Sequence, residues 1–185
     1  MSLKKKLRAV ARVASTNVRL AFGKLVHGRR LRYSPATCLA LSDAVELSPA
    51  GSLDFSRGLR TRGRCSFNVQ ESGSLSFGEG VFLNSGCQFN CHSRITVGAG
   101  CEFGSNVLVY DHDHTYRGGS LKEGGFQYGD VSIGDNCWIG SNTVILRGTV
   151  IGDECVVGAG SVLKGEYPSG SLVFQRRQTE VRDAC

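Results

Sequence analysis

The sequence lacks several features that would assign it to a familiar class. It has only 3 prolines and 1 methionine, and no apolar run approaches the ~18 residues that a membrane-spanning helix needs. None of its 8 cysteines forms a CxxC pair, and no secretory signal precedes them. A disulfide framework and a zinc site are therefore not expected. We expect a protein of the reducing cytoplasm, without membrane-spanning segments.

Acidic residues are absent from residues 1–34, which hold ten Lys or Arg. The net charge of +6 is therefore local, because the rest of the chain has 12 basic residues against 16 acidic ones. A basic face over the whole domain would favour nucleic acid as a partner, and this distribution argues against it. A basic segment on a mildly acidic body instead favours an anionic membrane surface or a docking partner.

Glycine is abundant, with 25 residues, and a unit of six residues repeats along the chain. From residue 133 to residue 168 most hexads begin with Ile or Val and continue with Gly, and the pattern recurs in residues 77–94 and 97–114. Each hexad can supply a short strand and a tight turn, with its first side chain inward and glycine at the corner. Coils of three hexads must then stack to bury their apolar side chains.

The repeat predicts an all-β fold, a parallel β-helix over residues 35–175. The segments that start at Ser52 and Ser74 look alike and lie 22 residues apart, which indicates opening coils with longer corners. The fifth position of the hexad takes a small residue, so we interpret the cysteines found there as buried core residues rather than metal ligands or redox groups. These are Cys87, Cys101, Cys137 and Cys155.

Residues 3–26 predict an amphipathic basic helix within the N-terminal segment 1–34. Apolar side chains recur every three or four positions, with Lys and Arg between them. One interpretation is an interfacial helix that holds the protein near anionic lipid. The other is a helix packed on the β-helix or on a neighbouring subunit, with its charges solvated. The two are compatible if one face packs and the other faces lipid.

The regular coils break once, in a polar, Gly-rich excursion over residues 110–130. A loop of this kind on a rigid repeat is typical of a functional site. Asp111, His112, Asp113 and His114 follow one another in it. Histidine can remove a hydroxyl proton near neutral pH, and a neighbouring acid can fix its tautomer. On these residues alone a general base, a metal site and a solvated polar turn stay open.

The stretch CWIGSNTVILRGTVIGDECVVGAGSVL, residues 137–163, resembles the hexapeptide-repeat acyltransferases. It is most similar to the sugar and polysaccharide O-acetyltransferases of the galactoside, maltose, capsule and colanic-acid types. The resemblance implies a left-handed β-helix, acetyl-CoA as co-substrate without a metal, and a role in polysaccharide biosynthesis. It also implies a homotrimer with each site between two subunits.

The resemblance assigns roles to individual residues. His112 matches the catalytic base, and His114 would assist with the acceptor. Asn84, His92 and Asp111 are expected to contact the sugar, although His92 stands where the galactoside enzymes have an acidic residue. The acyl donor is expected along a track of Trp138, Ser141, Gly158, Ala159 and Lys164, with Arg176 and Arg177 of the C-terminal tail 176–185 near the phosphates of CoA.

We therefore expect transfer of an acetyl group from acetyl-CoA to a hydroxyl of a sugar or polysaccharide precursor. The acceptor could be lipid-linked, with the enzyme peripheral at the inner face of the membrane. The alternatives are N-acetyl transfer to an amino sugar and a non-catalytic β-helix scaffold. A γ-type carbonic anhydrase, which holds zinc by three histidines on this fold, is disfavoured, because the chain has only 4 His and lacks the His-x4-His spacing.

Overall fold

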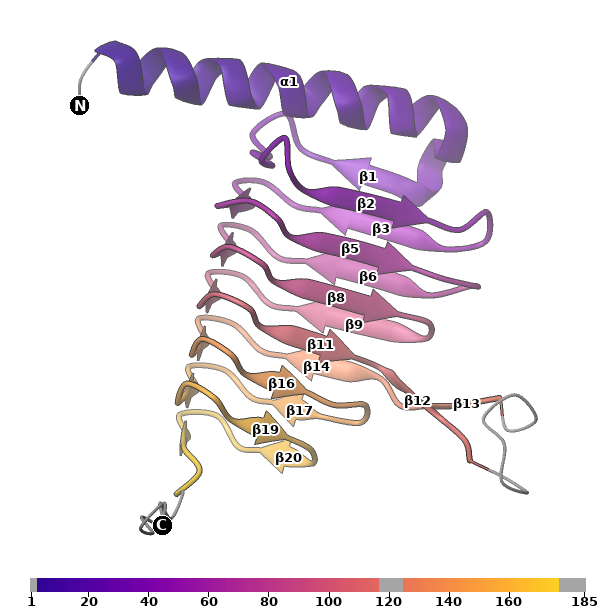
Figure 1. Cartoon of the computed structure of the whole chain (residues 1–185), viewed down its shortest axis with the longest axis vertical. Helices are drawn as coiled ribbons and strands as arrows, with labels where there is room; N and C mark the ends of the chain where they lie inside the picture. Colours follow the sequence, from indigo (N-terminus) through magenta and orange to yellow (C-terminus); the bar gives the residue numbers. More distant parts are fainter. Residues whose placement is uncertain (1–2, 117–124, 177–185) are drawn as a thin grey trace, which may run out of the picture.

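The computed structural model describes residues 3–116 and 125–176 as a stack of short strands closed at one end by a helix (Figure 1). Helix α1 (Leu3–His27) leads into a short 3₁₀ helix, η1 (Gly28–Arg30), and the strands follow. Side chains of α1 are described for Leu7 and from residue 9 onward. The first strand begins at Leu31, so the β-helix starts inside the segment 1–34 that the sequence assigns to the helix.

Three parallel sheets form the sides of the stack, and each sheet joins strands that lie one coil apart. Sheet 1 contains β1 (Leu31–Tyr33), β3 (Ser52–Phe55), β6 (Ser74–Phe77), β9 (Arg94–Val97), β14 (Val131–Ile133), β17 (Val150–Ile151) and β20 (Glu166–Tyr167). Sheet 2 contains β4 (Arg60–Thr61), β7 (Phe82–Leu83), β10 (Glu102–Phe103), β15 (Trp138–Ile139), β18 (Val156–Val157) and β21 (Leu172–Val173). Sheet 3 contains β2 (Ala44–Leu47), β5 (Ser66–Val69), β8 (Gln88–Cys91), β11 (Leu108–Tyr110), β16 (Val144–Ile145) and β19 (Val162–Leu163).

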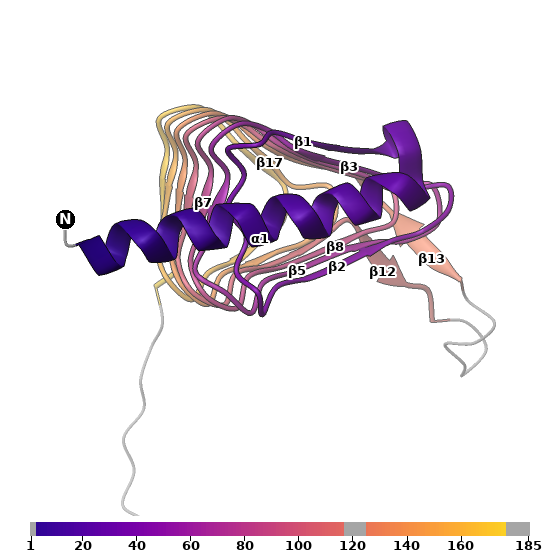
Figure 2. The ribbon, with the colours of Figure 1, turned by 90° about the horizontal axis from the view of Figure 1, so that it is seen from above.

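The coil is left-handed. Within one coil the chain passes from sheet 3 to sheet 1 and then to sheet 2, as β2, β3 and β4 do. Seen from the N-terminal end (Figure 2), this path runs counterclockwise while the chain moves away from the viewer. The predicted left-handed parallel β-helix with an N-terminal helix is confirmed, against the usual right-handed rule for parallel crossovers.

The coils become shorter along the chain. Paired residues of sheet 1 lie 22 positions apart near the start (Ser52 with Ser74) and 18 apart later (Ser132 with Val150), so the predicted longer opening coils are confirmed. Aromatic rings fill the wider coils, and smaller aliphatic side chains fill the narrower ones, which keeps the interior close-packed. The buried rings touch in sequence along the axis, and they are Phe55, Phe67, Phe77, Phe89 and Phe103.

The second and fourth positions of the hexad have different roles at the corners. The fourth position takes the left-handed backbone, with φ of 57° at Asn106 and 55° at Asn136. Gly98, at a second position, has no positive φ, but a Cβ on it would lie 2.4 Å from Asp135 Oδ1 in the next coil. The recurring second-position glycine therefore serves the close stacking of coils.

The fifth-position cysteines are core residues, as the sequence predicts. All four are at most 1% exposed, and each thiol donates to a backbone carbonyl of the next coil, as Cys101 does to Gly134 at 3.0 Å. The cysteines that the structure describes are all free thiols. Their place in the core, rather than in a redox or metal site, follows from this burial.

Helix α1 lies across the open end of the β-helix (Figures 1 and 2). Its inward face combines Leu20, which joins the hydrophobic core, with Arg12, Thr16 and Arg19. Arg19 donates to the carbonyl of Ala40 at 2.9 Å, and Arg12 donates to that of Leu39 at 3.2 Å. Thr16 is buried and bonds both the N–H and the C=O of Leu39. The first coil has no coil above it, so its carbonyls need other donors, and the helix supplies them. The helix thus packs on the β-helix, as one interpretation expects. The expectation that its charges are solvated is wrong for Arg12 and Arg19.

Replacing Arg19 by methionine should lower the free energy of unfolding by about 1–3 kcal/mol, because two carbonyls lose a charged donor while an apolar stem remains. Those carbonyls belong to Ala40 and Asp43. The measurement is urea unfolding of the full chain followed by circular dichroism. Arg29→Met, at an exposed position of η1, is the matched control and should change the stability by less than about 0.5 kcal/mol. Unchanged stability of the Arg19 variant would contradict this docking of α1.

Candidate active site

The excursion leaves the β-helix at the corner between β11 and β14, where sheet 3 passes into sheet 1 (Figure 1). It contains an antiparallel hairpin of β12 (His112–His114) and β13 (Phe126–Tyr128), with His112 opposite Tyr128 and His114 opposite Phe126. Residues 117–124 of the excursion lie outside the described residues. The polar loop that the sequence predicts thus contains two short strands, which fix where its histidines lie.

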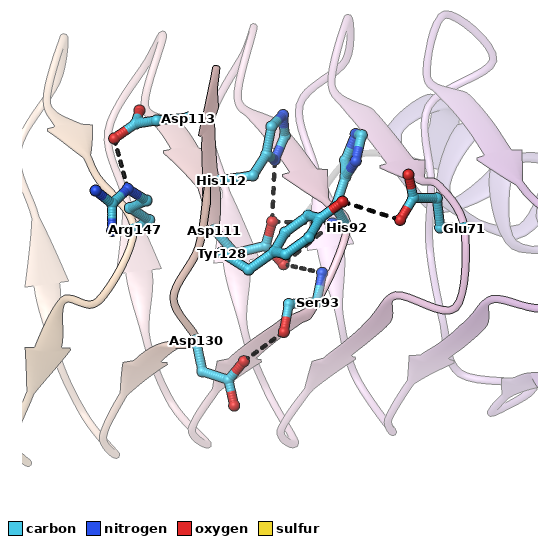
Figure 3. Close-up of polar contacts among 9 residues, drawn as sticks. All are labelled: Glu71, His92, Ser93, Asp111, His112, Asp113, Tyr128, Asp130 and Arg147. Carbon is cyan, nitrogen blue, oxygen red and sulfur yellow. Dashed lines mark hydrogen bonds and ion pairs between the residues drawn. The ribbon is translucent and has the colours of Figure 1, made fainter. Parts of the chain in front are cut away.

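Asp111 is fully buried at the base of this hairpin (Figure 3). Its carboxylate accepts hydrogen bonds from the backbone N–H groups of His92 at 2.9 Å and Ser93 at 2.7 Å. Those groups belong to the previous coil, and the pairing of Tyr110 with Asn90 brings Asp111 beside them. Such donors offset the cost of burying a carboxylate. The side chain of Asp111 is not accessible to a sugar. The predicted contact between Asp111 and the sugar is therefore wrong, and Asp111 contacts groups of its own chain instead.

The third partner of Asp111 is the ring of His112. Its Nδ1 lies 3.0 Å from Asp111 Oδ1, and the side chain of His112 is 13% exposed. A carboxylate only accepts hydrogen bonds, so this contact requires a proton on Nδ1, and Nε2 of the neutral ring then carries the lone pair. The arrangement can accept a proton at Nε2, which favours a general base over a solvated polar turn at this position.

His92 stacks against His112. The ring centroids are 3.8 Å apart with an angle of 33° between the planes, and Nδ1 of His92 is buried without a hydrogen-bond partner in the part of the chain that the structure describes. Burial lowers the pKa of His92, and the neighbouring His112 lowers it further. His92 therefore stays neutral at pH values where an ordinary histidine is protonated, so the pair avoids carrying two positive charges.

The two faces of the hairpin differ in chemistry, because side chains alternate along each strand. His112, His114, Phe126 and Tyr128 share one face, where the ring of His114 lies 4.6 Å from that of Phe126. The ring of His92 lies 4.9 Å from Phe126 and extends this face onto the β-helix. The result is an aromatic wall beside His112, of the kind that stacks against flat or ring-shaped ligands.

Polar contacts hold the hairpin from both sides (Figure 3). Asp113 and Gln127 lie on the face opposite the aromatic wall, and Arg147, one coil later, bonds each of them at 2.7 Å. From the aromatic face, the hydroxyl of Tyr128 donates to Glu71 Oε2 at 3.1 Å, two coils earlier. The hairpin therefore has side-chain partners along the corner both above and below itself.

Replacing Arg147 by methionine should free one face of the hairpin. The Arg147–Asp113 pair is partly exposed, and charged hydrogen bonds of this kind are worth about 1–2 kcal/mol. The expected loss in kcat/KM of any reaction at this site is therefore about 5–30-fold. Arg147→Lys should restore only part of the loss, because an ammonium cannot bond Asp113 and Gln127 with the planar fork of a guanidinium. Initial rates and amide hydrogen exchange over residues 110–130 provide the measurements. Unchanged exchange in the methionine variant would show that Arg147 does not hold the hairpin.

Most residues predicted to bind the acyl donor lie elsewhere. Trp138, in β15, is 58% exposed on sheet 2. Ser141 follows β15, and Gly158 and Ala159 follow β18, so they lie at the corner between sheets 2 and 3. Asn84 follows β7 at this same corner. Within one chain, the structure does not bring these residues to the hairpin of His112, which lies at the corner between sheets 3 and 1.

The remaining predicted donor residues lie in the last coils, but not together. Lys164 follows β19 at the corner that carries His112, whereas Arg176 comes after β21. Arg177 lies outside the described residues. Across residues 3–116 and 125–176, no three His, Cys, Asp or Glu side chains are grouped so that they could hold a metal ion.

Sequence reasoning missed several contributors to the corner, namely Glu71, Ser93, Phe126 and Tyr128. For Phe126 and Tyr128 a signal was present, because HDH and FQY each have a polar or acidic residue between two ring side chains, which is the alternation of paired strands. Glu71 and Ser93 have no such signal, because they reach the site only through the stacking of coils. Arg147 stands out in the sequence as a positive charge at a coil corner, where it could bind a phosphate of CoA or an anionic acceptor, but its contacts with Asp113 and Gln127 were not predicted.

Residues 130–165 match the family model described as bacterial transferase hexapeptide (six repeats). These residues therefore carry the hexapeptide repeat of that model. The resemblance of the chain to the hexapeptide-repeat acyltransferases is also confirmed by curated relatives. The putative lipopolysaccharide biosynthesis O-acetyl transferase WbbJ of Escherichia coli is 32% identical over an alignment of 92 residues that covers 43% of this chain and 45% of that protein. The galactoside O-acetyltransferase of E. coli is 35% identical over 74 residues, 40% of this chain and 36% of that one.

The match is partial in length, since the chain spans less than half of these relatives. Among solved structures, AntD, an N-acyltransferase from Bacillus cereus in complex with dTDP and 3-hydroxybutyryl-CoA, has a TM-score of 0.68 at 16% identity, covering 82% of this chain and 80% of that chain. A hexapeptide-repeat acetyltransferase from Vibrio cholerae in complex with acetyl-CoA has a TM-score of 0.54 at 18% identity, covering 91% and 82%. At these identities the structural likeness shows the shared fold.

Proposed function

We propose that this protein transfers an acetyl group from acetyl-CoA to a hydroxyl of a sugar or polysaccharide precursor, with His112 as the general base. The observation that carries the proposal is the contact between Asp111 and His112, which leaves Nε2 of His112 as the proton acceptor. The curated relatives support the reaction class, because two of them are named as O-acetyltransferases, one of lipopolysaccharide biosynthesis and one of galactosides.

In the proposed reaction, Nε2 of His112 takes the proton of the acceptor hydroxyl as its oxygen attacks the carbonyl carbon of the acetyl thioester. The bond from that carbon to sulfur then breaks. The CoA thiolate leaves and receives the proton from the imidazolium, so the base is restored. Asp111 stabilises the positive ring without giving up its own place in the core. Backbone N–H groups near Ser141 would stabilise the oxyanion, as the family resemblance implies.

A homotrimer with each site between two subunits is part of the proposal. Most of the predicted donor residues, with exposed Trp138 among them, lie away from the corner of His112. One chain alone therefore does not assemble the base and the donor track. A neighbouring subunit that places its sheet 2 beside the hairpin would complete the site. Such an assembly would let His112 act on an acyl donor that is bound along the neighbour's Trp138, Ser141, Gly158 and Ala159, with Lys164 contributed from the corner that carries His112.

The acceptor would bind beside the aromatic wall. Of the residues predicted to bind the sugar, His92 is the one whose ring contacts the ring of His112 within the same chain. Rings of this kind stack on the apolar faces of sugars. Asn84 would approach an acceptor from the other corner, and so from the neighbouring subunit. His114, exposed at the hairpin, would assist with the acceptor rather than take its proton.

The test is acetyl transfer by the purified full chain, with acetyl-CoA and a panel of glycans, nucleotide sugars and lipid-linked sugars. Released CoA is measured with a thiol reagent, and products are identified by mass spectrometry. An added acetyl group that hydroxylamine removes is an ester, whereas one that resists is an amide. An amide product would indicate N-acetyl transfer to an amino sugar. We retain this reaction as the second candidate, because AntD, which shares the fold, is named as an N-acyltransferase. Absence of both CoA binding and transfer would leave a β-helix scaffold.

A further inference from the structure

The outward face of α1 is apolar, which is unusual for a helix at the surface. Six large apolar side chains on α1 are each 61–82% exposed. They are Leu7, Val10, Val18, Phe22, Leu25 and Val26. We call them the apolar stripe. In Figure 1 the helix lies above the first coil, at the top, and none of the described chain covers its outer side.

The orientation of α1 explains why the stripe is left exposed. The coil end presents backbone carbonyls, so Arg12, Thr16 and Arg19 take the inward face. The opposite face of a helix lies half a turn away, and the apolar side chains occupy it. Packing α1 on its own β-helix therefore uses these polar side chains together with Leu20, and leaves the apolar stripe for another surface.

Positive charge adjoins the apolar stripe. Where α1 ends, Arg29, Arg30 and Arg32 line a groove of about 310 Å³ together with Ser52 and Ser74. Arg32 pairs with Asp54, whereas Arg29 and Arg30 belong to η1 and are exposed. Asp54 also lines the groove, where Arg32 neutralises it, so the guanidinium groups of Arg29 and Arg30 and the hydroxyl donors are left to suit phosphate oxygens. No acidic residue occurs anywhere in residues 1–34.

We propose that the apolar stripe docks on an anionic lipid surface, with Arg29 and Arg30 binding lipid phosphates in the adjoining groove. In the described residues no helix is long and apolar enough to cross a membrane, so α1 would lie along the interface. A second copy of this chain is the less suitable occupant, because it would bring together two segments that each carry ten basic residues and no acid. Anionic lipid instead offers charges of opposite sign.

The experiment is flotation of the full chain with vesicles of phosphatidylcholine alone and of phosphatidylcholine and phosphatidylglycerol in equal parts. The wild-type chain should float with the mixed vesicles and much less with the neutral ones. The variant Phe22→Ser with Leu25→Ser should bind the mixed vesicles at least about tenfold more weakly, because both side chains are exposed and their removal takes apolar area from the interface. Arg29→Ser with Arg30→Ser should reduce the preference for phosphatidylglycerol.

Leu172→Ser is the matched control, since Leu172 is 68% exposed in β21 at the opposite end of the β-helix. It should bind vesicles as the wild type does. The proposal is overturned if the Phe22 and Leu25 variant floats as well as the wild type. It is also overturned if no variant floats and sedimentation shows that the same two substitutions dissociate a larger assembly, because the stripe would then join copies of the chain. Neither outcome depends on acetyl transfer.

Discussion

His112→Ala should lower kcat for acetyl transfer by about 10²–10⁴-fold, the usual contribution of a positioned general base. In the wild-type chain the contact with Asp111 leaves the lone pair on Nε2 of His112 free to take the proton of the acceptor hydroxyl. The alanine variant lacks this group, so the hydroxyl would have to lose its proton to water. Binding of acetyl-CoA should change little, since His112 acts on the proton of the acceptor and most of the predicted donor residues lie at another corner of the chain. Steady-state rates with a confirmed acceptor and calorimetry with CoA give the two measurements.

His114→Ala is the matched control, because His114 lies on the same face of the same strand, two residues away. His114 is exposed and its ring contacts Phe126, so its removal should reduce the rate by about tenfold or less, through the acceptor. If the His114 variant lost activity while the His112 variant kept most of it, the base would have to be reassigned. Equal unfolding midpoints of the two variants would exclude a difference in stability as the cause.

The β-helix was predictable from the sequence because its signal is repeated. Most hexads carry an inward apolar side chain and a close-stacking glycine, so a departure at one position is outweighed by the agreement of the others. The shorter coils after Val131 therefore follow directly from the pattern. The width of the early coils was visible only as the 22-residue spacing, and its cause, a column of buried phenylalanines, appears only when the coils are stacked.

The site was predictable only in part, because it is built across coils. His112 stands out in the sequence as a histidine in the one break of the repeat. The burial of Asp111 could not be predicted, since its donors, the N–H groups of His92 and Ser93, lie about 20 positions earlier and meet it through the register of β8 and β11. Arg147 reaches Asp113 in the same way, from a later coil.

The orientation of α1 shows the same limit. Periodicity predicts that one face is apolar and the other basic, but not which face packs. A rule that buries the apolar face fails here because the end of a β-helix is a row of backbone groups rather than an apolar surface. Arg19 and Thr16 satisfy those groups, as an apolar side chain could not.

Asp111→Asn should lower kcat by about 10²–10⁴-fold while keeping the shape of the site, the larger loss applying if the tautomer of His112 is reversed. The amide oxygen of Asn can still accept from the N–H groups of His92 and Ser93, which leaves its NH₂ group facing His112. An NH₂ group only donates, so Nδ1 of His112 must become the acceptor and Nε2 must carry the proton. The base would then present a proton where it should accept one.

A purely structural role for Asp111 makes a different forecast, so ring nitrogen shifts separate the two. In ¹⁵N spectra of the wild-type chain, Nδ1 of neutral His112 should be protonated, and in the Asn variant Nε2 should be. The Asn variant should unfold at nearly the wild-type urea concentration, whereas Asp111→Ala should be destabilised by about 1–3 kcal/mol, because it leaves two buried N–H groups without acceptors. Loss of activity with the Nδ1 tautomer intact would mean that Asp111 supports the fold of the corner and does not orient the base.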